Sequence, residues 1–325
     1  MNKKYCAVVL LLCLMILMSA CKRSGAATGG APRTPFIGGT SAITLNFEKD
    51  SPPPEVTDDQ SFAFNVLVRM KNDGEYAVDR NNIRLNLVGF DPNDFGAVFD
   101  DLRDVQPDDN LDSKKRDGEG NIVEGTTTFA TFPKSGASFV PSRFSGNTEF
   151  TFRADACYYY ETETGPSICI DPQPFSTENK VCQVQDLTFS SGQGAPIAIT
   201  RIDQEAFATK TQFRITIKNA GNGEVAEPDS SRCSTQTLGR DQIDKVRLDF
   251  ARVSTTPLDC GPFIDNSVKG ASGTVRLISG EGSIICELPS GLYSSSLTAY
   301  TTPLSIKLSY TYRTHTQRNL MIVKE

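Results

Sequence analysis

The sequence predicts an all-β protein in which two antiparallel β-sandwiches follow one another along the chain. Two observations predict this fold: apolar and polar residues alternate over many short segments, and clusters of Asn, Asp, Gly and Pro separate those segments. Alternation with a period of two buries one face of a strand and leaves the other face in water, as in an antiparallel sheet. A helical pattern is nearly absent, and only residues 93–104 predict one short helix.

The predicted strands are spread from residue 43 to residue 308. Turn-forming residues lie between them, which favours short connections over long helical crossovers. The clearest alternating segments are Ile43–Phe47, Phe62–Met70, Ile83–Leu87, Phe150–Phe152, Phe213–Ile217, Val246–Phe250 and Leu304–Leu308.

Two landmarks recur in the same order and with nearly the same spacing. The segment Phe64–Glu75 resembles Phe213–Glu224, and the Lys-Asn pairs within them lie 147 residues apart. The segment Tyr158–Thr164 resembles Tyr310–Thr316, 152 residues further along. A period this long is typical of two copies of a globular domain and not of a solenoid.

The repeat places a domain boundary near the middle of the chain. We expect one β-sandwich domain at residues 36–175 and a second at 180–325, joined by a hinge at 171–180 that contains two prolines. Each domain is then expected to fold without the other.

The N-terminal segment is typical of a secreted protein. Two lysines precede an apolar run at Cys6–Met18, and Ser19-Ala20-Cys21 follows. This end resembles the lipobox of bacterial lipoproteins, which implies a signal peptide at 1–20, acylation of Cys21 and retention on the extracytoplasmic face of the cell membrane. An uncleaved membrane anchor and ordinary secretion are the alternatives, although the apolar run is shorter than the about 20 residues of a spanning helix.

Residues 21–35 are small, polar and rich in glycine, so we expect a flexible tether after the lipid. Without the signal peptide, 31 basic residues remain against 39 acidic ones, a net charge of −8. This balance disfavours nucleic acid as a partner, because phosphates require clustered Lys and Arg. The single histidine, His315, is expected to be an ordinary surface residue of a strand, and we expect no cofactor.

Six cysteines follow Cys21, and an even number outside the cytoplasm predicts three disulfides. The spacing lacks Cys-x-x-Cys, which disfavours zinc. We expect a hairpin around residues 161–165 that joins its two flanking cysteines, and the alternative is a bond from Cys182 to one of these two. The expected pairs are Cys157–Cys169, Cys260–Cys286 and Cys182–Cys233.

Two other segments are candidates for chemistry. Asp108, Asn110, Asp112 and Glu119 stand at positions 1, 3, 5 and 12 of a calcium-loop pattern, but three basic residues interrupt it and no glycine provides the sharp turn, so a solvated loop is favoured. The Tyr158–Tyr160 strand is either a stacking platform for a ligand or part of the core, and we favour the core.

The Lys-Asn-x-Gly segments also resemble a known family. Immunoglobulin-like sandwiches of the CARDB type carry Val-x-Asn-x-Gly at the end of a long strand, and Met70–Gly74 and Ile217–Gly221 resemble it. Gly192–Pro196 and Cys157–Tyr160 resemble segments of archaeal-type surface lipoproteins. This resemblance implies two tandem immunoglobulin-like domains, and it implies no catalytic residues.

Together these features predict a non-enzymatic surface lipoprotein that presents two domains for binding or adhesion. The expected partners are the membrane, through the lipid, and an extracellular protein or glycan. A structural subunit of the cell envelope or of a surface filament is the alternative, and a hydrolase that uses paired carboxylates is a third hypothesis.

Overall fold

The structure is a computed structural model that describes residues 36–177, 179–229, 233, 238–265, 269–288 and 298–325. These residues belong to one compact unit, Pro35–Glu325. The expected signal peptide, the acylation site Cys21 and the tether lie outside the described residues.

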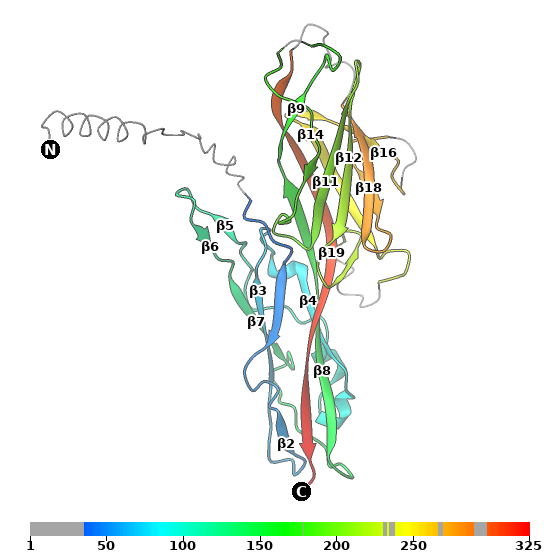
Figure 1. The fold of residues 1–325 in the computed structure, drawn as a ribbon. Coiled ribbons are helices and arrows are strands. Elements are labelled where there is room, and N and C mark those ends of the chain that lie inside the picture. The colour runs from blue at the N-terminus through cyan, green and yellow to red at the C-terminus, as the bar shows by residue number, and fades with distance from the viewer. Residues whose placement is uncertain (1–35, 178, 230–232, 234–237, 266–268, 289–297) are drawn as a thin grey trace, which may run out of the picture. The chain divides into compact units, whose positions relative to one another are not determined.

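The largest sheet contains nine strands (Figure 1). Its strands are β2 (Glu55–Thr57), β4 (Ile83–Val88), β8 (Thr148–Thr164), β9 (Ser167–Ile170), β13 (Glu224–Ala226), β14 (Lys245–Val253), β15 (Thr256–Pro257), β17 (Gly273–Arg276) and β19 (Tyr300–Val323). The main order is β15-β14-β19-β8-β4; β2, β9 and β13 pair with β19, and β17 pairs with β14.

Two smaller sheets complete the core. One has the order β1-β3-β7, and the other has the order β10-β11-β12-β18-β16. Strand β1 contacts β19, and β11 contacts β8, so both small sheets pack against the large one. The bounds are β1 (Ile43–Phe47), β3 (Val66–Asn72), β7 (Thr127–Phe132), β10 (Leu187–Thr188), β11 (Ile197–Ala206), β12 (Thr211–Asn219), β16 (Asp259–Gly261) and β18 (Glu281–Glu287).

The predicted all-β class is confirmed, and so is the alternation that predicted it. In β1 every second residue is buried, and β3 and β4 bury alternate residues in the same way. The residues at 117–121 form the turn of a hairpin between β5 (Lys115–Arg116) and β6 (Ile122–Val123).

The helical content differs from the single short helix expected at 93–104. The structure has two 3-10 helices there, η2 (Pro92–Phe95) and η3 (Phe99–Leu102), and a third, η1 (Arg80–Asn82), precedes β4. Gly96 ends η2 because its backbone is left-handed, with φ of 60°, which a continuing helix does not allow.

The pairing of β8 with β19 connects the two halves of the sequence. These strands are antiparallel and in register without interruption from Thr148↔Ile322 to Thr164↔Ile306. Strand β8 precedes the expected boundary at 171–180, and β19 follows it. The boundary therefore does not separate the strands of the large sheet, and segments 36–175 and 180–325 share one sheet (Figure 1).

The small sheets have the same register around the two Lys-Asn pairs. Ile43 lies opposite Asn72 in the β1–β3 pair, and Ile197 lies opposite Asn219 in the β11–β12 pair. Strand β7 pairs with β3 on its other side, and β18 pairs with β12 in the same way. Residues of β1 therefore have counterparts in β11 that can be compared one by one.

Two of the three expected disulfide pairs are wrong. The structure joins Cys157 to Cys233 and Cys169 to Cys182, whereas we expected Cys157–Cys169 and Cys182–Cys233. The third expected pair, Cys260–Cys286, is confirmed, and these two residues lie directly opposite each other in the β16–β18 pair.

The expected bond between Cys157 and Cys169 fails for a simple physical reason. Residues 161–165 do not reverse the chain: β9 continues beside β19 in the register of β8, with Ser167 opposite Pro303 and Thr164 opposite Ile306. At about 3.3 Å per residue, the two cysteines expected to pair lie roughly 40 Å apart along this line. Pro166 lies between β8 and β9 and lacks an N–H group. It therefore interrupts the hydrogen bonds to β19 without reversing the chain.

Peptide mapping under non-reducing conditions is expected to recover Cys157–Cys233, Cys169–Cys182 and Cys260–Cys286. Replacing both Cys157 and Cys233 with serine is expected to lower the free energy of unfolding by about 2–5 kcal/mol, because the bond closes a long loop. A Cys157–Cys169 peptide in the oxidised, folded protein would contradict the register of β8, β9 and β19.

Fragments 36–175 and 180–325 are expected not to fold alone, because each would lose the partner of its longest strand. Mixed in equal amounts, they are expected to recover the dispersed NMR spectrum of the intact chain. A chain cut at Gly118 is the control, since this exposed turn carries no part of the large sheet. Cooperative unfolding of either fragment by itself would show that the shared sheet is dispensable.

Candidate functional site

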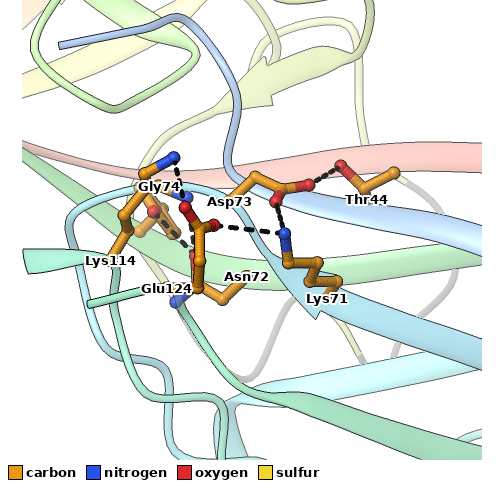
Figure 2. Close-up of polar contacts among 8 residues, drawn as sticks. Thr44, Lys71, Asn72, Asp73, Gly74, Lys114 and Glu124 are labelled. Carbon is orange, nitrogen blue, oxygen red and sulfur yellow. Dashed lines mark hydrogen bonds and ion pairs between the residues drawn. The ribbon is translucent and has the colours of Figure 1, made fainter. Parts of the chain in front are cut away.

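The Lys-Asn-Asp-Gly segment at the end of β3 is built around the buried amide of Asn72 (Figure 2). Its Nδ2 donates to the carbonyls of Tyr76, at 2.7 Å, and Leu111, at 3.3 Å. Its Oδ1 accepts from the Gly74 N–H and from the Tyr160 hydroxyl. All the bonding capacity of a buried carboxamide is therefore used to fix a turn.

Gly74 is required by the close approach of the tyrosine. An added Cβ at this position would overlap the Tyr160 hydroxyl and the carbonyl oxygens of Ser41 and Gly194. The glycine therefore permits three chain segments to approach closely. This explains why the Lys-Asn-Asp-Gly segment ends in glycine.

The second Lys-Asn pair makes corresponding contacts. The Asn219 Oδ1 accepts from the Gly221 N–H and from the Tyr312 hydroxyl, and its Nδ2 donates to the Gly223 carbonyl. An added Cβ at Gly221 would overlap the Tyr312 hydroxyl. Thus each Asn-x-Gly turn is fixed by the second tyrosine of a Tyr-x-Tyr segment.

The four tyrosines of these segments form a cluster in the centre of the β8–β19 pair. Tyr158 lies opposite Tyr312, and Tyr160 lies opposite Tyr310, with ring centroids 6.0 and 6.3 Å apart. All four are buried, and burial raises the pKa of each hydroxyl. They therefore stay neutral and hold the sheets together, so the core interpretation of Tyr158 and Tyr160 holds and the stacking platform does not.

Tyr159 points to the opposite face of β8, as its place in the strand predicts. Its hydroxyl donates to Glu161 Oε1 at 2.7 Å, and burial beside this carboxylate raises the pKa of Tyr159. Tyr159 is half-buried, and its ring packs edge-on against Tyr76 with the ring centroids 6.0 Å apart.

Charged side chains surround the Asn72 turn on its outer side (Figure 2). Lys71 pairs with Asp73 at 2.7 Å and with Glu124 at 3.3 Å, and Lys114 also pairs with Glu124. Thr44 donates to Asp73, which connects β1 to this network. Exposed pairs of this kind contribute little to stability, and with all four charges paired the network offers no surplus charge to a ligand.

The residues of the calcium candidate take part in other contacts. Asn110 Oδ1 accepts from the Arg80 N–H, and Glu119 lies in the β5–β6 turn, where it accepts from Asn121. The Asp108 carbonyl accepts from the Arg80 guanidinium, and the Asp112 N–H donates to Thr126. Among the described residues, no group of three or more His, Cys, Asp or Glu side chains is placed to hold a metal ion.

A cavity of about 270 Å³ lies beside β1 and is the best candidate for a binding site. One wall is the edge of β1 with the residues just before it, and the opposite wall is β19. The lining combines hydroxyl, amide and imidazole groups with apolar side chains. They are Thr40, Ser41, Ala42, Ile43, Thr44, Leu45, Tyr158, Pro196, Ala220, Gly221, Asn222, Tyr312, Thr314 and His315.

The segment that leads into β1 and this cavity wall is fixed by hydrogen bonds. The backbone N–H groups of Ile37 and Gly38 donate to Glu75 Oε1 at 2.8 and 2.6 Å. The Gly39 N–H donates to the Ser191 carbonyl, and the Gly194 N–H donates back to the Gly39 carbonyl. The wall is therefore formed in advance of any ligand.

His315 is exposed on β19, as expected for a surface strand residue, and it lies opposite Asp155. The sequence did not indicate the cavity itself. Its walls come from residues 40–45, 158, 196, 220–222 and 312–315, which only the register of the strands brings together.

Comparison with known proteins does not assign the chain to a family. No protein-family model matches the chain, and no curated protein matches it. Among solved structures, the secreted serine protease VesC from Vibrio cholerae is similar at 7% identity and a TM-score of 0.17, over 83% of this chain and 50% of that chain. The chain spans about half the length of that protease. A structural similarity this weak supports no conclusion about fold or function. No helix of the described residues is long and apolar enough to cross a membrane.

Replacing Asn72 with alanine is expected to lower the free energy of unfolding by about 1–3 kcal/mol, because the buried hydroxyl and backbone groups lose their partner. Asn219→Ala is expected to act in the same direction. Asn121→Ala, in the exposed β5–β6 turn, is the control, with an expected change within about 0.5 kcal/mol. Urea unfolding monitored by circular dichroism measures all three, and equal effects of Asn72 and Asn121 would contradict the structural role.

Proposed function

We propose that the chain is a lipid-anchored surface protein that binds an extracellular partner without catalysis. The main support for this proposal is that all six cysteines after Cys21 form disulfides, three in total. Disulfides of this density are typical of proteins outside the cytoplasm. The lysines, the apolar run and Ser19-Ala20-Cys21 at the N-terminus agree with export and lipidation.

The same proposal includes two immunoglobulin-like sandwiches that arose by duplication. The matching contacts of Asn72 with Tyr160 and of Asn219 with Tyr312 support it. So does the matching register of β1–β3 and β11–β12. The two units are proposed to be fused through β8 and β19 and to present their loops and strand edges as one rigid body.

Lipid retention is tested by replacing Cys21 with serine. The variant is expected to leave the membrane fraction or to accumulate as an unprocessed precursor, because the acylated thiol is gone. Cys13→Ser is the matched control, since it changes a cysteine within the apolar run and leaves Cys21 in place. Metabolic labelling with a palmitate analogue measures acylation, and equal labelling and fractionation of the Cys21 variant and the wild type would refute the anchor.

A further inference from the structure

The edge of β1 that faces the cavity has unpaired backbone groups. The Asp73 N–H donates to the Ala42 carbonyl and the Glu48 N–H donates to the Leu67 carbonyl, so the even-numbered residues of this strand bond to β3. In an antiparallel ladder the residues between them point their N–H and C=O groups the other way. The backbone groups of Ile43, Leu45 and Phe47 therefore face away from β3.

The corresponding edge of β11 is closed by the chain itself. The Ile197 carbonyl accepts from Thr162 Oγ1 at 2.6 Å. The Gln193 side chain accepts from the Ile199 N–H at 2.8 Å and donates to the Ile199 carbonyl at 3.0 Å. Strand β10 then pairs with Arg201 and Ile202. The Gln193 carboxamide thus makes the two hydrogen bonds that the backbone of a neighbouring strand would make.

On β1 only the two ends of the edge are closed. The Ile43 backbone bonds to the Tyr158 hydroxyl, and the Phe47 carbonyl accepts from Arg318 at 3.4 Å. Leu45, the counterpart of Ile199, lies between them. Within the part of the chain that the structure describes, no hydrogen bond reaches its outward N–H or C=O.

The wall across from Leu45 is also more open than its counterpart. Thr314 lies 152 residues after Thr162, the spacing of the two Tyr-x-Tyr segments. Thr162 is buried and bonded to Ile197, whereas Thr314 is half-exposed and lines the cavity. The cavity therefore occupies the place where the other half of the molecule closes its strand edge.

We propose that the cavity beside β1 is a strand-acceptor groove that binds an extended, uncharged peptide segment of a partner protein. A strand edge offers alternating donors and acceptors at the spacing of another extended backbone, which is the basis of β-strand addition. The counterpart edge is closed by polypeptide groups, at Gln193 and β10, which indicates the kind of occupant. The proposal rests on the binding function above and adds its site and the class of its partner.

The chemistry of the walls selects the side chains of the guest. Hydroxyl and amide groups line the groove together with apolar side chains, and none of the lining residues is Asp, Glu, Lys or Arg. Small polar residues such as Ser, Thr and Asn fit these walls, and a charged guest residue would find no lining carboxylate or amine as a partner. The tether at 21–35 is a poor guest, because prolines and glycines interrupt it.

The test uses the full-length protein in detergent and a phage library of linear twelve-residue random peptides as the probe. Selected peptides are expected to bind the wild type and to lose at least about tenfold in affinity with Thr314→Trp, whose indole fills the groove. Gln317→Trp is the matched control, since this exposed residue of β19 lies outside the groove.

Hydrogen exchange of the wild type gives a readout that does not depend on the folding of a variant. Peptide binding is expected to slow exchange of the Leu45 amide and to leave the Ile199 amide unchanged. Three results would overturn the proposal: no peptide enriched above the blank, equal binding to Thr314→Trp and wild type, or protection at another surface. Self-association that Thr314→Trp abolishes would overturn it in favour of a second copy as the occupant. None of these results depends on Cys21, so the anchor and the groove fail or hold separately.

Discussion

The pairing of β8 with β19 is the constraint on which the rest of the structure depends. These two strands lie beside each other over the whole length of β8. Strands β2, β4, β9, β13 and β14 pair with one or the other, and β15 and β17 pair with β14. The four tyrosines at the centre of this pair reach into both small sheets, where the hydroxyls of Tyr160 and Tyr312 fix the two Asn-x-Gly turns. The conformation of each turn is thus tied to a strand of the shared sheet.

Local patterns in the sequence predicted local structure well. Alternation identified Ile43–Phe47 and Ile83–Leu87 as strands, because a strand with one buried face has an apolar residue at every second position. The core position of Tyr158 and Tyr160 was favoured because aromatic residues are common in strands, and both side chains are buried.

Long-range pairing could not be predicted in the same way. The polar run after Tyr160 has the composition of a turn, yet the chain continues straight along β19, and this single difference changed two disulfides. Composition determines whether residues suit a turn, while the available partner strand determines whether they form one. The groove beside β1 was missed for the same reason: neither Leu45 nor Thr314 carries a motif, and their closeness depends on register alone.

The order of the strands along the chain has a consequence for biogenesis. Strand β8 is made long before residues 300–323, so during synthesis its central edge stays without a partner while the intervening residues are added. Contacts between residues so distant in sequence form late, since their loop-closure entropy must be overcome first. Under the export proposed above, β8 crosses the membrane before its partner strand β19. Its maturation is therefore expected to require holdase protection of the exposed β8 edge against aggregation.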